Sequence, residues 1–242
     1  MENNTINYRS PIYVQLREII RNKIEDGEYL PGMAIPSEST LADTYGINRL
    51  TVRNAIDTLV NEGLLKRVQG KGVYVMGGKV QRDLEYLGGF TQTMREKNKT
   101  PKTKVLSKWI RKAGEKFSVI FNISPEDEIY YIKRICYADD EPVSLEEIYI
   151  PHYIVPKLDG IDLSIFTIYE VYDFYGIKLK RANQTLDIVK LQQNDARMLN
   201  IDSNFPVFLF ECMSYDEKDR VIEFAHTYTR GDMCDFNVNF YK

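Results

Sequence analysis

The sequence predicts an α+β protein in two parts, a short helical part ending in a hairpin and a longer part of mostly antiparallel strands. In the first part, apolar residues recur three and four apart and are followed by a glycine-rich turn. In the second, runs rich in Val, Ile, Tyr and Phe alternate with short turn sequences. A chain of 242 residues can form two domains with separate cores. We expect them over residues 1–76 and 86–242, with a linker at 77–85 where the periodicity is weak.

A first helix is expected to begin at Ser10-Pro11, with serine as the cap and proline in the first helical position. Asp26-Gly27 should end it. Between them one apolar stripe runs along the helix, formed by Ile12, Leu16, Ile19, Ile20 and Ile24. This helix should brace the elements that follow.

Two short helices joined by a tight turn are expected next. Ser37 can cap the first, and Gly46 stands where a helix end needs a left-handed residue. Asn48 can cap the second helix, whose buried face carries Val52, Ile56, Leu59 and Val60. Arg49 and Arg53 are four residues apart and should point the same way from the end that a helix-turn-helix inserts into the major groove.

A hairpin completes this domain. Two short predicted strands, 64–68 and 73–76, flank the basic turn Gln69-Gly70-Lys71-Gly72, which is typical of a wing. The net charge of −3 does not indicate a nucleic-acid binder, so the prediction depends on the local excess of basic residues between 49 and 76. The alternative is an ordinary solvated helix face. The expected DNA contacts are Ser37, Ser39, Asn48, Arg49, Thr51, Arg53, Gln69, Gly70 and Lys71.

The order Pro-Ser-Glu, Leu-Ala, Tyr-Gly, Thr-Val-Arg, Glu-Gly-Leu-Leu and Gly-Lys-Gly resembles the GntR family of bacterial transcription regulators. The resemblance implies a winged helix-turn-helix fold, with the family's usual contacts on Arg49, Arg53 and Gly70. Ser39 and Thr40 stand where the family commonly has arginine and glutamate. One DNA contact and one capping-box partner are therefore absent, and the preferred operator should differ accordingly.

The second domain is expected to be a mostly antiparallel sheet. Its predicted strands are 105–111, 129–137, 143–150, 178–190, 207–215, 221–229 and 236–241, and its predicted helices are 115–121, 167–175 and 193–199. Asp139-Asp140 and residues 216–219 lie between neighbouring strand runs and indicate hairpin turns.

This domain resembles the ligand-sensing UTRA domain of the HutC-type branch of these regulators, whose fold is similar to chorismate lyase. The resemblance is carried by Gly89-Phe90-Thr91, by residues 138–142, by Glu146 with Tyr149-Ile150-Pro151, and by residues 223–232. It implies an anion site formed by Phe90, Thr91, Arg134, Cys136 and Thr167, with Glu146, Glu223 and Tyr228 lining the rest of a pocket.

The implied ligand is a phosphorylated sugar. Backbone N–H groups at a helix start and an arginine fork favour negative charge, and carboxylates and a phenol suit sugar hydroxyls. Cys136 replaces the second arginine of the relatives' clamp, so half of the cationic clamp is missing. Alternatively, Glu146 pairs with Arg134 across the hairpin and Tyr228 is ordinary sheet packing.

Other classes of protein and site are disfavoured. Cys136, Cys212 and Cys234 show no paired spacing, and two histidines supply no zinc ligand set, so neither metal nor cofactor is expected. No apolar run approaches the ~20 residues that span a bilayer, and a cytoplasmic location is expected.

The expected function is that of a homodimeric repressor that binds double-stranded DNA at a palindromic operator and is released by a small anionic effector. Two alternatives stay open: a lyase-type enzyme, for which no Ser/His/Asp or Cys/His set is visible, and a DNA-binding protein that needs no ligand.

Overall fold

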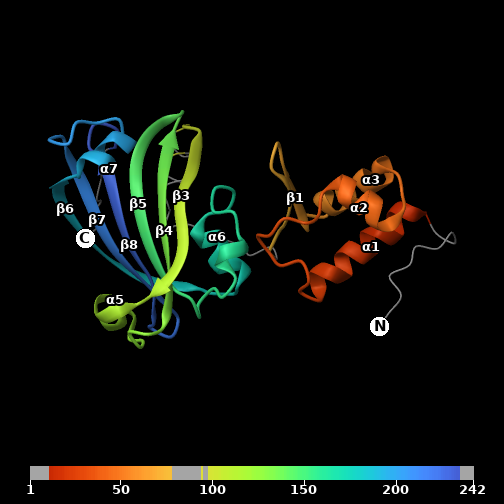
Figure 1. Cartoon of the computed structure of the whole chain (residues 1–242), viewed down its shortest axis with the longest axis horizontal. Helices are drawn as coiled ribbons and strands as arrows, with labels where there is room; N and C mark the ends of the chain where they lie inside the picture. Colours follow the sequence, from red (N-terminus) through yellow and green to blue (C-terminus); the bar gives the residue numbers. More distant parts are fainter. Residues whose placement is uncertain (1–10, 78–93, 95–97, 235–242) are drawn as a thin grey trace, which may run out of the picture. The chain divides into compact units, whose positions relative to one another are not determined.

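The computed structural model describes residues 11–77, 94 and 98–234. The chain divides into two compact units with the main boundary between residues 81 and 82, and each unit is described by itself (Figure 1). The expected linker at 77–85, apart from residue 77, and the expected strand at 236–241 lie outside the described residues.

The N-terminal unit contains α1 (Ile12–Glu25), α2 (Glu38–Tyr45), α3 (Arg49–Asn61), β1 (Leu65–Val68) and β2 (Gly72–Val75). One boundary differs from the sequence prediction, because Pro11 is the N-cap of α1 and not its first helical residue. Its ψ of 131° is extended, while its carbonyl accepts from Val14 N at 2.9 Å, as expected of a residue that precedes the helix.

The turn between α2 and α3 forms as its residue types predict. Ser37 Oγ accepts from Thr40 N at 3.1 Å, and Asn48 Oδ1 accepts from Thr51 N at 2.8 Å. Gly46 ends α2 in the left-handed conformation, with φ 65° and ψ 33°. The start of α3 is thereby fixed relative to α2.

One apolar core unites the three helices and the β1–β2 hairpin. Its buried members are Leu16, Ile20, Ile35, Leu41, Ala42, Val52, Ala55, Ile56, Leu59, Leu65, Val73 and Val75. The hairpin is antiparallel, and Ala34 adds a single bridge to Tyr74. Because all three helices contribute to this core, α3 presents a fixed outer face.

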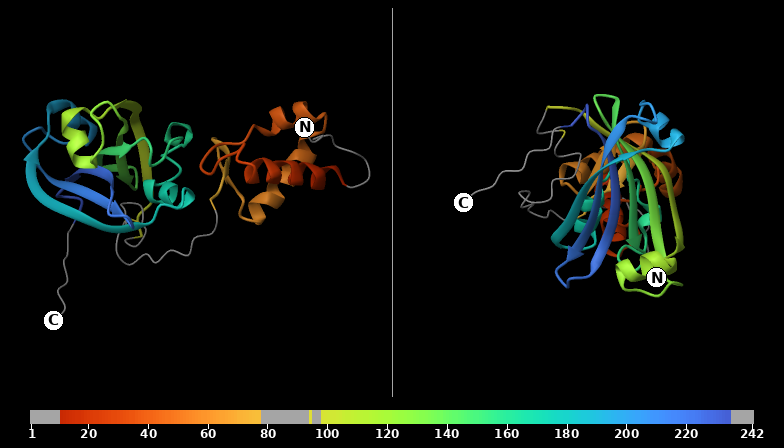
Figure 2. Two further views of the ribbon diagram at one scale, coloured as in Figure 1. Left: turned by 90° about the horizontal axis from the view of Figure 1, so that it is seen from below. Right: turned by 90° about the vertical axis from the view of Figure 1, so that its left-hand side faces the viewer.

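The C-terminal unit is a six-stranded antiparallel sheet with strand order β3-β4-β5-β8-β7-β6, and it curves strongly (Figures 1 and 2). Along the chain its elements are β3 (Pro101–Lys112), α5 (Gly114–Phe121), β4 (Glu128–Ala138), β5 (Glu141–Pro151), a 3₁₀ turn η1 (Leu158–Gly160), α6 (Ile168–Phe174), β6 (Leu179–Lys190), α7 (Gln193–Met198), β7 (Pro206–Asp216) and β8 (Val221–Arg230). The predicted α+β class is confirmed, and only η1 among these elements was not predicted.

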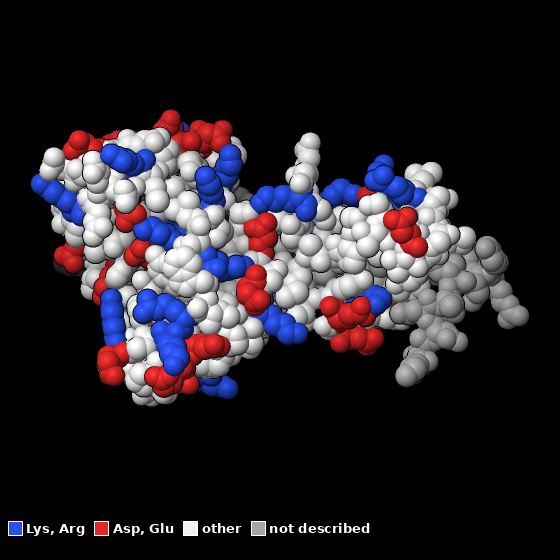
Figure 3. Space-filling model, viewed as in Figure 1, with Lys and Arg blue, Asp and Glu red and all other residues white. Residues whose placement is uncertain are grey.

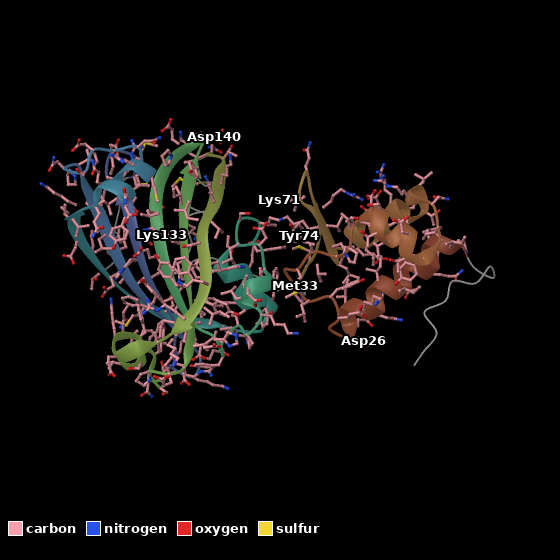
Figure 4. All side chains as sticks on the ribbon, viewed as in Figure 1. Asp26, Met33, Lys71, Tyr74, Lys133 and Asp140 are labelled. Atoms are coloured by element: carbon pink, nitrogen blue, oxygen red, sulfur yellow. The ribbon has the colours of Figure 1, made fainter. Side chains whose placement is uncertain are left out.

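The turn between β4 and β5 shows how short polar sequences set the register. Asp139 and Asp140 both have positive φ, 51° and 67° (Figure 4 labels Asp140). Two such residues in succession form a tight hairpin that matches the strand twist. A β-bulge between Cys136 and Tyr137 then shifts the register by one residue, so that Arg134 lies directly opposite Glu146.

The two faces of the sheet carry different residues, because alternate residues of a strand point to opposite faces. The face covered by α5 and α7, here the α5/α7 face, carries the apolar residues Ile129, Ile135, Leu145 and Phe224 together with an ion pair between Lys133 and Glu147. The opposite face, here the α6 face, carries Arg134, Glu146 and Glu223, with Glu223 bonded to Tyr172 of α6. No helix in the described part of the chain is long and apolar enough to cross a membrane.

Candidate functional site

The outer face of α3 is the first candidate site. Val52, Ala55, Ile56 and Leu59 of this helix are buried, whereas Arg49, Leu50, Arg53 and Asn54 are exposed. At ~100° per residue the exposed set lies on the side away from the core. A helix docked in a major groove presents residues of its first turns in this way.

A carboxylate from α2 organises two arginines beside this face. Glu38 accepts from Arg53 Nη2 at 3.0 Å and from Arg67 Nη1 at 2.7 Å. Arg67 also reaches Asp57 Oδ1 at 2.7 Å. The pKa of Glu38 is lowered mainly by the hydrogen bond from Arg53, and further by the hydrogen bond from Arg67. The Glu38 side chain is only 11% exposed. Glu38, Asp57, Arg53 and Arg67 thus form an ion-pair network between α2, α3 and β1.

The hairpin tip is the second part of this surface. Gly70 and Gly72 have φ values of 74° and 119°, so the tight turn needs glycine at both positions. Gln69, Gly70 and Lys71 are exposed, and Lys71 is labelled in Figure 4. Figure 3 shows Lys and Arg side chains along the edge of the N-terminal unit where α3 and the hairpin project. Such an edge suits a phosphate backbone.

The remaining predicted DNA contacts stand at helix starts. Ser37 and Asn48 use their side chains as N-caps. Ser39 Oγ lies 2.9 Å from Ser37 Oγ, and Thr51 Oγ1 donates to Asn48 Oδ1 at 2.9 Å. The sequence did not predict the contact between Glu38 and Arg67, because nothing in the spacing shows that residues 29 apart are paired.

The second candidate site is a group of side chains on the α6 face, here called the polar cluster. It consists of Arg134, Cys136, Ser144, Glu146, Tyr169, Tyr172, Ser214 and Glu223. Arg134 and Glu146 face each other on β4 and β5, with Nε and Oε2 2.5 Å apart. Burial alone would lower the pKa of Arg134, but the Glu146 carboxylate offsets this and the pKa is raised. Arg134 is therefore charged in the folded protein.

Glu223 is the second carboxylate of the polar cluster and is 5% exposed. It accepts from Tyr172 Oη at 3.1 Å and from Ser214 Oγ at 3.4 Å. Burial raises the pKa of Glu223, although these hydrogen bonds and Arg134 oppose the shift. With one guanidinium and two carboxylates, the polar cluster contains more acidic than basic groups.

A thiol and a hydroxyl occupy the β4–β5 end of the polar cluster. Burial raises the pKa of Cys136 to about 12, so its thiol is neutral. Ser144 lies opposite Cys136, and apart from this thiol its buried Oγ has no hydrogen-bond partner in the described structure. A thiol is a weak partner, so this hydroxyl is available to a polar ligand.

The structure brings together Arg134, Cys136, Glu146 and Glu223, but not every residue proposed for the effector site. Phe90 and Thr91 lie outside the described residues. Thr167 caps α6, accepting from Glu170 N at 3.1 Å in a reciprocal capping box. Tyr169 and Tyr172, which sequence reasoning did not propose for the site, supply the phenols near Glu223.

Tyr228 is separated from the rest. It lies opposite Leu145 and Leu209 on β5 and β7 and packs into the core under α7. Residues 223 and 228 of one strand are an odd number apart, so they point to opposite faces. Placing Tyr228 beside Glu223 must therefore be corrected, and the alternative reading of Tyr228 as sheet packing fits its position. The Arg134–Glu146 pair likewise matches the alternative considered for Glu146.

Comparison with known proteins gives matches in both units. The family described as "Bacterial regulatory proteins, gntR family" matches residues 12–75, and the "UTRA domain" matches residues 96–235. The HTH-type transcriptional repressor NagR of Bacillus subtilis (strain 168) is 33% identical over 228 residues, 93% of each chain. A "Probable fructoselysine utilization operon transcriptional repressor" of Shigella flexneri is 27% identical over 229 residues, 94% of each chain.

Among solved structures, PhnF from Mycobacterium smegmatis has a similar fold. Its TM-score is 0.62 at 22% identity, with 95% of this chain and 98% of that chain covered. At this identity the similarity concerns the fold.

Proposed function

This chain belongs to the gntR family of bacterial regulatory proteins, with a UTRA domain after its DNA-binding domain, and we propose that it is a homodimeric repressor released from a palindromic operator by a small anionic sugar derivative. Like its relatives, it is a transcription regulator and not an enzyme. One observation carries the proposal. The same chain contains an exposed helix that bears arginines, as a recognition helix does, and a largely buried polar cluster.

The DNA-binding role assigns α3 to the major groove and the β1–β2 hairpin to the adjacent backbone. Arg49 and Arg53 can donate to guanine edges or phosphates, since both are exposed at the N-terminal end of α3. Gly70 and Lys71 lie at the exposed hairpin tip. Two N-terminal units of a symmetric dimer, bound about one helical turn of DNA apart, require a palindromic operator.

The dimer is proposed to form through β6. This strand is at one edge of the sheet, so one side of its backbone has no partner strand in the described fold. Leu186 and Ile188 lie two residues apart on the same side of β6, 50% and 69% exposed. Leu186→Glu with Ile188→Glu should convert the dimer to a monomer in sedimentation experiments, and an unchanged dimer would place the interface elsewhere.

The effector is proposed to bind at the polar cluster. Arg134 is its one guanidinium, so a single phosphate or carboxylate is the anion it suits. Glu146, Glu223 and Ser144 can bond to hydroxyl groups. A phosphorylated sugar meets both requirements, and one relative is named for the use of fructoselysine. Because Glu146 already holds Arg134, an anionic effector must compete with this carboxylate.

Operator binding measured with and without a panel of sugar phosphates and sugar carboxylates tests the proposal. The duplex is selected by the protein from a random-sequence pool, and the protein–DNA complex is followed by fluorescence anisotropy. Release by one compound supports the repressor. Chemical turnover of that compound would instead indicate an enzyme, and no response to any compound together with tight binding would indicate a ligand-independent DNA-binding protein.

A further inference from the structure

Leu50 is the second residue of α3, and its exposure is unlike that of the other apolar residues of this helix. It is 67% exposed, whereas Val52, Ile56 and Leu59 are fully buried. At ~100° per residue, Leu50 points about 170° away from the middle of the buried stripe. A large apolar side chain thus stands near the centre of the polar outer face of α3.

The neighbours of Leu50 on this face are polar. Arg49 precedes it, and Arg53 and Asn54 follow one turn later. Leu50 is not part of the core of the N-terminal unit, to which α3 contributes residues only from its opposite side. Folding of this unit therefore does not explain a leucine here.

We propose that Leu50 contacts the C5-methyl group of a thymine in the major groove and so selects A·T over G·C at one position of each half-site. The methyl group is the one apolar feature that a base pair displays in this groove. An arginine or lysine at this position would donate hydrogen bonds to an acceptor on the DNA. A leucine side chain contributes binding free energy only when it buries an apolar group. This inference rests on α3 being the recognition helix, as the proposed function states.

Replacing thymine by deoxyuridine removes this methyl group and leaves the hydrogen-bonding edge unchanged, which gives a direct test. The probe is the tightest duplex that the full-length protein selects from a random-sequence pool, and each thymine is replaced in turn. Deoxyuridine in place of the contacted thymidine of one half-site should weaken wild-type binding about fourfold, the value expected for burying one methyl group, and the replacement in both half-sites about 15-fold. Leu50→Ala, which truncates the side chain in both protomers, should weaken binding to the unmodified duplex by about the same 15-fold and should abolish the difference between the unmodified and deoxyuridine duplexes.

Two variants control for folding and for general surface effects. Leu50→Met keeps an apolar contact and should keep the discrimination between thymine and deoxyuridine. Val119→Ala truncates another apolar side chain, 80% exposed on α5, and should change nothing. An unchanged melting temperature of Leu50→Ala is expected, because the side chain packs against no core.

Several outcomes would overturn the inference. Wild-type protein could be indifferent to deoxyuridine at every position, or Leu50→Ala could keep the full discrimination. Alternatively, Leu50→Ala could alter only self-association of the chain, which would make this face a protein contact. Arg49→Ala on the same duplex separates this failure from a failure of the proposed function. If Arg49→Ala weakens binding while deoxyuridine has no effect, α3 still reads DNA and only the role of Leu50 is wrong.

Discussion

The carboxylate of Glu38 on α2 holds the guanidinium of Arg53 on α3, with Oε2 and Nη2 3.0 Å apart. The same carboxylate binds Arg67 of β1 at 2.7 Å. The direction in which Arg53 leaves α3 is therefore set before DNA arrives. Such pre-organisation reduces the side-chain entropy lost on binding, and it limits which groups on the DNA the arginine can reach.

Glu38→Gln should reduce the selectivity of the protein for its operator. Arg53 and Arg67 would lose their shared partner, and one negative charge near the DNA would be removed, so non-specific binding should strengthen. We expect the ratio of specific to non-specific affinity to fall about three- to fivefold, corresponding to the ~0.7–1 kcal/mol of an exposed ion pair. Anisotropy titrations with operator and random duplex over a range of salt concentrations measure this ratio.

Glu25→Gln is the matched control for Glu38→Gln. Glu25 is exposed in the last turn of α1 and its loss removes the same charge without touching the two arginines. If both variants reduce selectivity equally, the effect is one of total charge and Glu38 does not position Arg53.

Arg49→Ala and Arg53→Ala should each weaken operator binding by about 1–3 kcal/mol if the side chain reads a base edge. Competition with random duplex distinguishes a base contact from a phosphate contact, because loss of a phosphate contact weakens both duplexes alike. Arg197→Ala, in an exposed position on α7, serves as the control. Unchanged affinity in both variants would remove Arg49 and Arg53 from the interface.

The residue patterns that act locally in the chain predicted the fold well. Ser37, Gly46 and Asn48 determine helix ends through their own backbone neighbours, and Asp139-Asp140 determines a hairpin, so the sequence alone locates these features. Pro11 was misplaced by one position because a φ near −60° fits both the cap and the first helical residue. Only ψ distinguishes the two positions.

The candidate sites were less predictable because they depend on contacts between distant residues. The pairing of Glu38 with Arg67 joins residues 29 apart, and no spacing rule reveals it. Tyr228 was assigned to the wrong face because the resemblance was read residue by residue, without counting alternation along β8 from Glu223. Once residues 221–229 are predicted to form a strand, the sequence alone shows that residues 223 and 228 point to opposite faces.

If Glu146 and the effector compete for Arg134, two variants should change the affinity for the effector in opposite directions. Glu146→Gln should let an anionic effector bind more tightly, since Arg134 would no longer be neutralised at 2.5 Å. Arg134→Gln combined with Glu146→Gln should abolish the response to that effector while operator binding persists. The double variant avoids leaving one buried charge without its partner, which would itself destabilise the domain.

Isothermal titration with the effector found in the panel, together with operator release, measures both variants. If the double variant still responds to the effector with wild-type affinity, the anion does not bind at Arg134. If Glu146→Gln weakens binding, this carboxylate contacts the ligand more than it competes with it.

Glu223→Gln should stabilise the ligand-free protein at neutral and alkaline pH. Burial raises the pKa of Glu223 above its ordinary value of 4.5, so the folded state binds a proton here more tightly than the unfolded state. The ionised carboxylate therefore costs stability, fully so above the folded-state pKa and progressively less as pH falls towards 4.5. Glutamine keeps an acceptor for Tyr172 and removes the charge, while Arg134 keeps Glu146 as its partner.

The melting temperature of Glu223→Gln should exceed that of wild type by a few degrees at pH 8, at about 2–4 °C per kcal/mol for a chain of this size. The difference should shrink as the pH is lowered towards 5. Glu38→Gln should show the opposite dependence, because the lowered pKa of Glu38 means that its ionised form stabilises the fold and this contribution is lost in acid. A difference for Glu223→Gln that does not change with pH would show that packing, and not ionisation, separates the two side chains.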